Sequence, residues 1–140
     1  MPYQFVPHTA DVAVRVWADS LPGLFDQAAL AFADVTADAA AVDASETLDV
    51  AAESPELDVL FHDFLSELVF QFDARRWLAA GADVTVARDA GQWRLAGRLR
   101  GEPLSEPRHP VKTLVKAVTY HRLSVTEGEG RWDATVVFDI

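Results

Sequence analysis

Hydrophobic and polar residues alternate along several stretches of this chain, which is the pattern of half-buried β-strands. In residues 3–17, Val12, Val14 and Val16 share one face and predict a first strand. The turn sequence Gly128-Glu129-Gly130 predicts a hairpin that leads into a last strand. The predicted strands cover 3–17, a short stretch at 47–50, 82–87 and 92–100 on either side of a turn at 88–91, a hairpin arm from 123, and 132–140.

Two longer segments repeat apolar residues at helical spacing. Ser20 as N-cap, with Pro22 in the first turn, predicts the start of the first helix, and Ser54 followed by Pro55 predicts the start of the second. Residues 111–118 suit a short helix, although their β-branched content leaves a strand open. The apolar stripes are Leu21, Leu24, Phe25, Ala28, Phe32 and Val35 in the first helix and Leu57, Leu60, Phe61, Phe64, Leu68 and Phe72 in the second.

The order of these elements is strand, helix, strand, helix and then mainly strands. This order predicts an α+β fold, namely a two-layer sandwich with two long helices packed on one face of a mixed, mostly antiparallel sheet. Neither a linker nor an internal repeat interrupts the pattern, so we expect residues 1–140 to form a single domain.

Composition excludes several classes of chemistry. Half of the 140 residues are hydrophobic and none is cysteine, which rules out disulfides, thiolate catalysis and a cysteine zinc site. No secretory signal and no run of about 18 apolar residues is evident, so we expect a cytoplasmic protein without a membrane segment.

The formal net charge of −10 disfavours strong direct binding of nucleic acid, because such binding depends on Lys and Arg neutralising phosphates. A local basic patch around Arg108, Lys112, Lys116 and Arg122 stays open. An acidic surface is also compatible with a basic protein partner or with a metal ion.

Carboxylates at the two ends of the pattern are the main candidates for a metal site. Asp11 opens the first strand, Asp139 closes the last one, and the main-chain carboxylate of Ile140 follows. If the first and last strands are neighbours, these three groups converge and repel one another unless a cation lies among them. Hard cations such as Ca²⁺ and Mg²⁺ prefer several oxygen ligands, and bonding to nearby backbone amides is the alternative role for Asp11.

Other polar residues carry weaker signals. Lys112 and Lys116 share a face if their segment is helical, and Lys116 then suits a carboxylate or a phosphate, with a solvated basic face as the alternative. His8 and His121 suit metal binding or acid–base chemistry, or else structural hydrogen bonds. Glu67 lies four residues after Asp63 on the second helix, a spacing that suits an acid–base pair or simply a polar helix face.

Taken together, five segments make the chain resemble the archease family, and they occur in the family's order over essentially the whole length. Two positions depart from the family pattern, because Ser66 stands where Asn is common and Pro7 precedes His8 where an acid is common. The matching segments are His8-Thr9-Ala10-Asp11-Val12, Phe64-Leu65-Ser66-Glu67-Leu68-Val69-Phe70, Gly101-Glu102, Val115-Lys116-Ala117-Val118-Thr119-Tyr120-His121 and Val137-Phe138-Asp139-Ile140.

The resemblance implies an accessory protein of tRNA splicing and RNA repair, and not an enzyme. Archeases activate the GTP-dependent RNA ligase that joins 3′-phosphate or 2′,3′-cyclic-phosphate ends to 5′-hydroxyl ends. They promote guanylylation of the ligase's active-site histidine and thereby permit multiple turnover. The partner implied for this chain is therefore an RNA ligase of the tRNA-splicing type.

The resemblance also implies a metal site on Asp11, Asp139 and Ile140, with Ca²⁺ favoured and Mg²⁺ or Mn²⁺ also compatible. The motif lysine of the family corresponds to Lys116. His8, Glu67 and His121 match motif positions and are candidates for a supporting role.

Two rival functions stay open. The first is a small metal-dependent phosphoesterase centred on Asp11 and Asp139, with His8 or His121 as its base. The second is a structural module whose carboxylates are merely solvated. Turnover by the isolated protein would favour the phosphoesterase, whereas activity seen only with an RNA ligase would favour the activator.

Overall fold

The structure is a computed structural model that describes residues 11–140. Its helices are α1 (Leu21–Thr36) and α2 (Leu57–Arg75), with a short 3₁₀ turn at Ala39–Ala41. Its strands are β1 (Asp11–Ala18), β2 (Glu46–Ser54), β3 (Trp77–Asp89), β4 (Gln92–Pro103), β5 (Ala117–Val118), β6 (Ser124–Gly128) and β7 (Arg131–Asp139). No helix in this part of the chain is long and apolar enough to cross a membrane.

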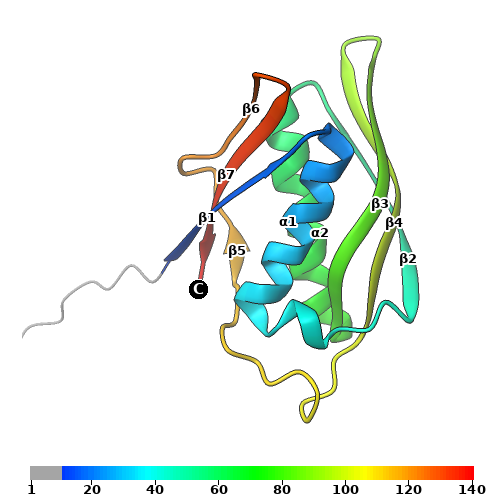
Figure 1. The fold of residues 1–140 in the computed structure, drawn as a ribbon, viewed down its shortest axis with the longest axis vertical. Coiled ribbons are helices and arrows are strands. Elements are labelled where there is room, and N and C mark those ends of the chain that lie inside the picture. The colour runs from blue at the N-terminus through cyan, green and yellow to red at the C-terminus, as the bar shows by residue number, and fades with distance from the viewer. Residues whose placement is uncertain (1–10) are drawn as a thin grey trace, which may run out of the picture.

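The strands form two sheets, and every strand pair is antiparallel. In the first sheet, β7 pairs with β1 on one edge and with β6 and then β5 on the other. In the second sheet, β4 lies between β2 and β3. Figure 1 shows the two helices between these sheets, and both helices contact strands of each. The predicted α+β fold is confirmed, and the structure adds the division of the strands into two sheets.

Aromatic side chains join the helices to each other and to the first sheet. The Phe25 ring of α1 lies 5.3 Å from that of Phe61 and 5.1 Å from that of Phe64, both on α2, in edge-to-face contacts. Phe32 packs in the same way on Phe138 of β7, at 6.1 Å. All five rings are almost wholly buried, as the helical spacing of the sequence requires.

Of the two predicted helix starts, the first is confirmed and the second is wrong. Ser20 caps α1 as expected, because its Oγ accepts a hydrogen bond from the Gly23 amide at 3.1 Å. The expected start of α2 at Ser54 and Pro55 is wrong, because Ser54 is the last residue of β2 and the helix begins at Leu57.

The short helix expected at residues 111–118 is also wrong, and the strand alternative holds for its last two residues. The amides of Lys112 and Thr113 donate to the carbonyl oxygen of Thr36 at the end of α1, at 2.8 and 3.3 Å. Ala117 and Val118 then pair with β7 as strand β5. Partners on other elements therefore satisfy the backbone groups that a helix would have paired internally.

Candidate functional site

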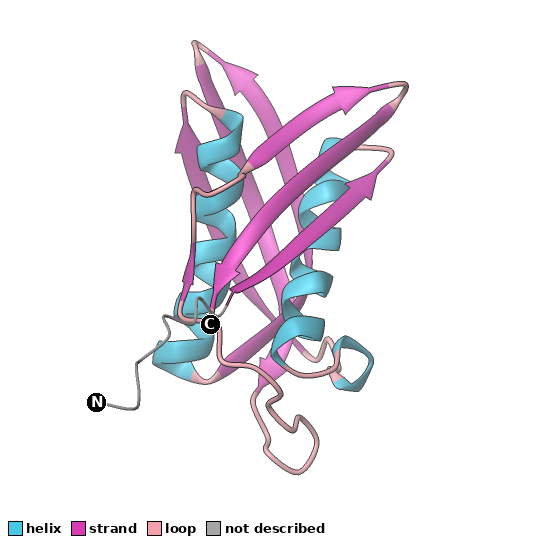
Figure 2. Cartoon of the chain, turned by 90° about the vertical axis from the view of Figure 1, so that its left-hand side faces the viewer, coloured by secondary structure: helices cyan, strands magenta, loops and turns pink. Residues whose placement is uncertain are grey.

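Asp11 and Asp139 lie directly opposite each other in the pair of β1 and β7. Figure 2 shows the end of the chain beside the beginning of β1, as this register requires. Ala134, Val136 and Phe138 of β7 point into the core, so Asp139 and its partner belong to the outer face of the sheet. Opposite residues have Cβ atoms about 4.5–5.5 Å apart, which places the two carboxylates side by side.

The two aspartates line a shallow pocket of about 390 Å³ together with Thr119, His121 and Val137. The Thr119 hydroxyl donates to the Val137 carbonyl oxygen at 2.9 Å, so its proton is already engaged. His121 is exposed at the edge of this pocket. The pocket therefore offers two exposed carboxylates, one exposed imidazole and the fixed hydroxyl of the half-buried Thr119.

Lys116 is joined to Asp139 through the backbone but not through its side chain. Its amide donates to the carbonyl oxygen of Asp139 at 2.7 Å, immediately before β5 begins. The Lys116 side chain instead borders a hollow of about 260 Å³ between β5 and α2. The residues that line this hollow are His62, Ser66, Val69, Phe70, Lys116, Ala117 and Val118.

The carboxylate pair suits a hard cation, but it does not complete a site by itself. Among residues 11–140, no three His, Asp or Glu side chains gather closely enough to hold a metal ion. Two carboxylates in register repel each other, which a bound cation would reverse. Oxygen donors of this kind fit Ca²⁺ or Mg²⁺. The remaining ligands would come from outside the pair, such as the Ile140 carboxylate or water.

The other predicted site residues do not join this pocket. Glu67 of α2 accepts a hydrogen bond from Gln71 Nε2 at 2.7 Å, and Asp63 Oδ1 lies 3.1 Å from His62 Nδ1. Each carboxylate thus has a different partner, and these contacts do not pair Asp63 with Glu67 for acid–base chemistry. His8 lies outside the described residues.

His62 has a role that the sequence did not signal. Its Nε2 donates to the carbonyl oxygen of Val118 at 3.0 Å, and its ring stacks on Tyr120 with centroids 4.0 Å apart. The imidazole thus links α2 to the free edge of β5. Only the packing of α2 against β5 reveals this role, because 56 residues separate His62 from Val118.

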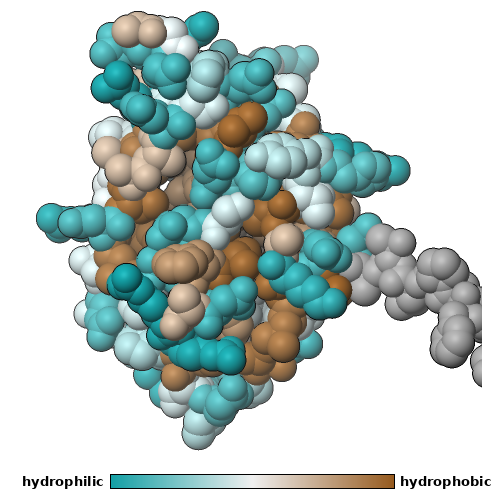
Figure 3. Space-filling model, turned by 180° about the vertical axis from the view of Figure 1, so that it is seen from behind, coloured by the Kyte–Doolittle hydropathy of each residue, from teal (hydrophilic) through white to brown (hydrophobic). Residues whose placement is uncertain are grey.

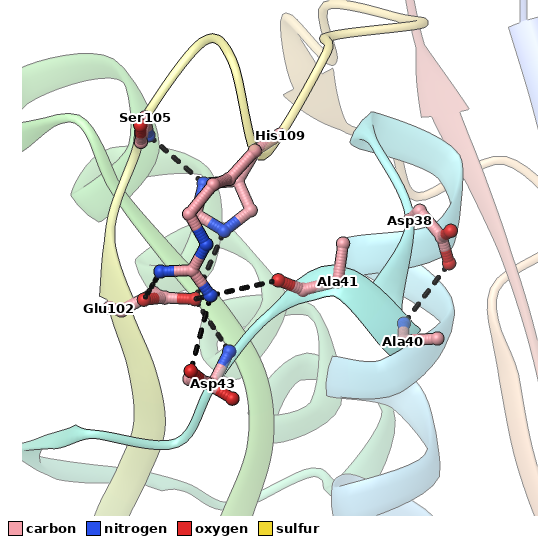
Figure 4. Close-up of polar contacts among 8 residues, drawn as sticks. Asp38, Ala40, Ala41, Asp43, Glu102, Ser105 and His109 are labelled. Atoms are coloured by element: carbon pink, nitrogen blue, oxygen red, sulfur yellow. Dashed lines mark hydrogen bonds and ion pairs between the residues drawn. The ribbon is translucent and has the colours of Figure 1, made fainter.

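A second polar cluster surrounds Glu102 at the end of β4 (Figure 4). Its Oε2 accepts from His109 Nε2 at 3.0 Å and from the Asp43 amide at 2.5 Å, and Arg108 binds both of its carboxylate oxygens. His109 Nδ1 accepts from the Ser105 amide at 2.9 Å, so the proton that this fully buried ring donates to Glu102 lies on Nε2.

This cluster fastens the loop that leads to Lys116. Burial by itself raises the pKa of Glu102, but hydrogen bonds from the Asp43 amide and His109, with the charge of Arg108, outweigh it and hold that pKa below its ordinary value. A charged Glu102 therefore anchors one end of the loop, and the Lys116 amide anchors the other on β7. The role of the Glu102 cluster is to position this loop, and none of its residues lines the carboxylate pocket.

Comparison with known proteins gives one consistent result. The sequence model of the Archease protein family matches residues 3–140. A protein archease of Methanopyrus kandleri is 40% identical over 140 residues, which is the full length of both chains. The protein archease of Pyrococcus furiosus is 31% identical over 139 residues, covering 99% of this chain and 98% of its own.

Solved structures resemble this fold as well. The solution structure of Methanobacterium thermoautotrophicum protein 1598 superposes with a TM-score of 0.79 at 29% identity and covers 96% of each chain. The crystal structure of an archease, possible chaperone, from Thermotoga maritima has a TM-score of 0.58 at 18% identity, covering 99% of this chain and 97% of its own. The second likeness concerns the fold alone.

Proposed function

This chain belongs to the archease family, and from that premise we propose that it activates a GTP-dependent RNA ligase of the tRNA-splicing type. The ligase joins 3′-phosphate or 2′,3′-cyclic-phosphate ends to 5′-hydroxyl ends. In this proposal the protein promotes guanylylation of the ligase histidine and multiple turnover. It is an accessory protein of the cytoplasm and does no chemistry of its own.

The observation that carries the proposal is the register pair of Asp11 and Asp139 on the outer face of the first sheet. Exposed like charges in register destabilise a sheet, so such a pair points to a binding role. Asp11, Asp139 and the Ile140 carboxylate would hold a hard cation, with Ca²⁺ favoured over Mg²⁺ or Mn²⁺ as in the sequence prediction. Such a cation would supply positive charge for phosphate oxygens.

Hydrogen bonds within the chain hold the acidic tip, by which we mean Asp11, Asp139 and the Ile140 carboxylate, where it would meet the ligase. The bond from the Lys116 amide to Asp139 fixes the end of β7 beside β5, and Thr119 fastens β5 to Val137. The tip would dock at the ligase's nucleotide pocket, where the ligase histidine attacks GTP. Lys116 would contact the ligase from the neighbouring hollow.

Within residues 11–140, the phosphoesterase alternative has no positioned base. His121 lines the carboxylate pocket, but within residues 11–140 no hydrogen bond holds its ring in place. A general base needs a defined position within hydrogen-bond reach of the proton that it removes. The described part of the site therefore favours presentation to a partner over hydrolysis.

A reconstituted joining reaction tests the proposal. Substoichiometric amounts of this protein are mixed with its own organism's RNA ligase, GTP, a divalent metal and a 3′-phosphate/5′-hydroxyl RNA pair. Guanylylation and joined RNA are followed over many turnovers. We expect Asp11→Asn and Asp139→Asn each to reduce stimulation by about tenfold or more, the scale of metal-site substitutions. Lys116→Ala should reduce it by about tenfold as well, through the loss of a contact with the ligase.

Asp49→Asn is the matched control, because it removes a carboxylate from β2 in the other sheet, where the side chain is 96% exposed. This variant should stimulate as the wild type does. Thermal unfolding of every variant verifies that the fold is intact. Full stimulation by Asp139→Asn would refute the role of the carboxylate pair, and turnover by the isolated wild type would favour the phosphoesterase.

A further inference from the structure

Exposed large apolar side chains occur on α2 and on both sides of β5. Phe70 of α2 is 51% exposed, Tyr120 after β5 is 61% exposed, and Leu114 before β5 is 58% exposed. Among residues 11–140, Trp17 is the one other large apolar residue exposed to this degree. Three of these four side chains therefore belong to α2 or to the segment around Lys116.

We call the hollow between these elements the β5–α2 groove, lined by the seven residues named above for the Lys116 hollow. His62, Ser66 and Phe70 follow one another at intervals of four residues and share a face of α2. Tyr120 stacks on His62 and extends the aromatic surface of the groove. Seen from behind, on the side where α2 lies, the surface shows apolar residues among polar ones (Figure 3).

The size and composition of the groove suit a protein side chain. Its volume of about 260 Å³ is below the roughly 300–1,000 Å³ of small-molecule pockets. Aromatic residues are enriched in the centre of protein interfaces. Lys116 forms no ion pair with the described residues, so its ammonium group is available to a carboxylate of a partner. The formal net charge of −10 disfavours RNA as the occupant.

We propose that the β5–α2 groove is the surface on which the RNA ligase docks. The ligase would insert an apolar side chain between Phe70 and Tyr120 and place a carboxylate at Lys116. This inference rests on the proposed function and adds its docking surface. The argument for the ligase is continuity, because β5 separates the groove from the pocket of Asp11 and Asp139, and a partner seated in one reaches the other.

Binding and stimulation, measured separately, test this docking surface. Phe70→Ser and Tyr120→Ser remove exposed rings, and Trp17→Ser removes a ring of similar exposure from the outer face of β1. With the ligase immobilised, we expect each groove variant to raise the Kd about tenfold, as for interface hot spots, and Trp17→Ser to leave it unchanged. At saturating concentration, Phe70→Ser should restore the wild-type stimulation.

Several outcomes would overturn the docking surface. They are unchanged Kd values in both groove variants, an equal loss in Trp17→Ser, or no binding of the wild type to the ligase. Sedimentation that shows a wild-type dimer and a monomeric Phe70→Ser would assign the groove to a second copy. Binding of single-stranded RNA that Tyr120→Ser abolishes would assign it to RNA.

The same measurements separate the two proposals. Groove-dependent binding of the ligase without any stimulation would keep the docking surface and refute the activator function. Stimulation that survives unchanged in both groove variants at limiting concentration would keep the activator function and refute the docking surface.

Discussion

Asp11 and Asp139 face each other as like charges, and this arrangement predicts how the fold responds to a cation. Without divalent metal, Asp139→Asn should leave the free energy of unfolding equal or slightly higher, because it removes a repulsion. With Ca²⁺ at 100 times its Kd, the wild type should gain about 2.7 kcal/mol, and Asp11→Asn and Asp139→Asn should lose this gain. Denaturant unfolding with EDTA or CaCl₂ measures both effects.

The control for this experiment is again Asp49→Asn, which should gain as much from Ca²⁺ as the wild type. Repeating the titration with Mg²⁺ and Mn²⁺ ranks the candidate cations. A residue added after Ile140 should weaken the effect if its main-chain carboxylate is a ligand. Equal Ca²⁺ stabilisation of the wild type and Asp139→Asn would contradict the proposed metal site.

At the scale of elements, the loop between β4 and β5 depends on the charge of Glu102. Because its pKa is lowered in the fold, Glu102 stabilises the protein above its ordinary pKa of 4.5, and this contribution is lost as the pH falls through the lowered value. Glu102→Ala should therefore lower the free energy of unfolding by about 1–3 kcal/mol at pH 7, with a difference that shrinks in acid.

Glu53→Ala is the control for that titration. Glu53 is an exposed carboxylate that pairs with Arg94 at 3.6 Å, so its removal should change stability by less than about 1 kcal/mol at any pH. Urea unfolding from pH 7 to pH 3 provides the comparison. A Glu102→Ala difference that stays constant over this range would contradict the anchoring role.

The same scale shows which elements the sequence could predict. Ser20 identified the start of α1 because its cap is a local interaction, with Gly23 three residues away. The prediction that Ser54 begins α2 was wrong because β2 continues through Ser54, which pairs with Trp93 of β4, a partner far along the chain. The short helix predicted at residues 111–118 was wrong for the same reason, since the backbone partners of this segment are Thr36 and β7.

The sequence could predict one part of the candidate site, and the other part depends on tertiary packing. The opposition of Asp11 and Asp139 could be anticipated, because it needs only that the first and last strands pair. The placement of Lys116 in a separate groove could not, because it depends on which side of β5 faces α2. The stacking of His62 on Tyr120 likewise follows from tertiary packing alone.

At the scale of the whole molecule, the formal net charge of −10 acts over distances that individual contacts do not reach. In the proposed complex, the ligase's nucleotide pocket binds GTP phosphates and is cationic, so it should attract this acidic protein before contact. We expect the association rate constant with the ligase to fall about tenfold or more between about 20 and 300 mM salt. Stopped-flow fluorescence at several ionic strengths measures this dependence.

Phe70→Ser provides the matched comparison, because it removes a contact without changing charge. Its defect should appear in the dissociation rate constant, while its association rate constant keeps the salt dependence of the wild type. This separation would assign long-range attraction to the acidic surface and the lifetime of the complex to the β5–α2 groove. An association rate constant that is independent of salt would contradict the electrostatic part of this account and leave the groove as the determinant of binding.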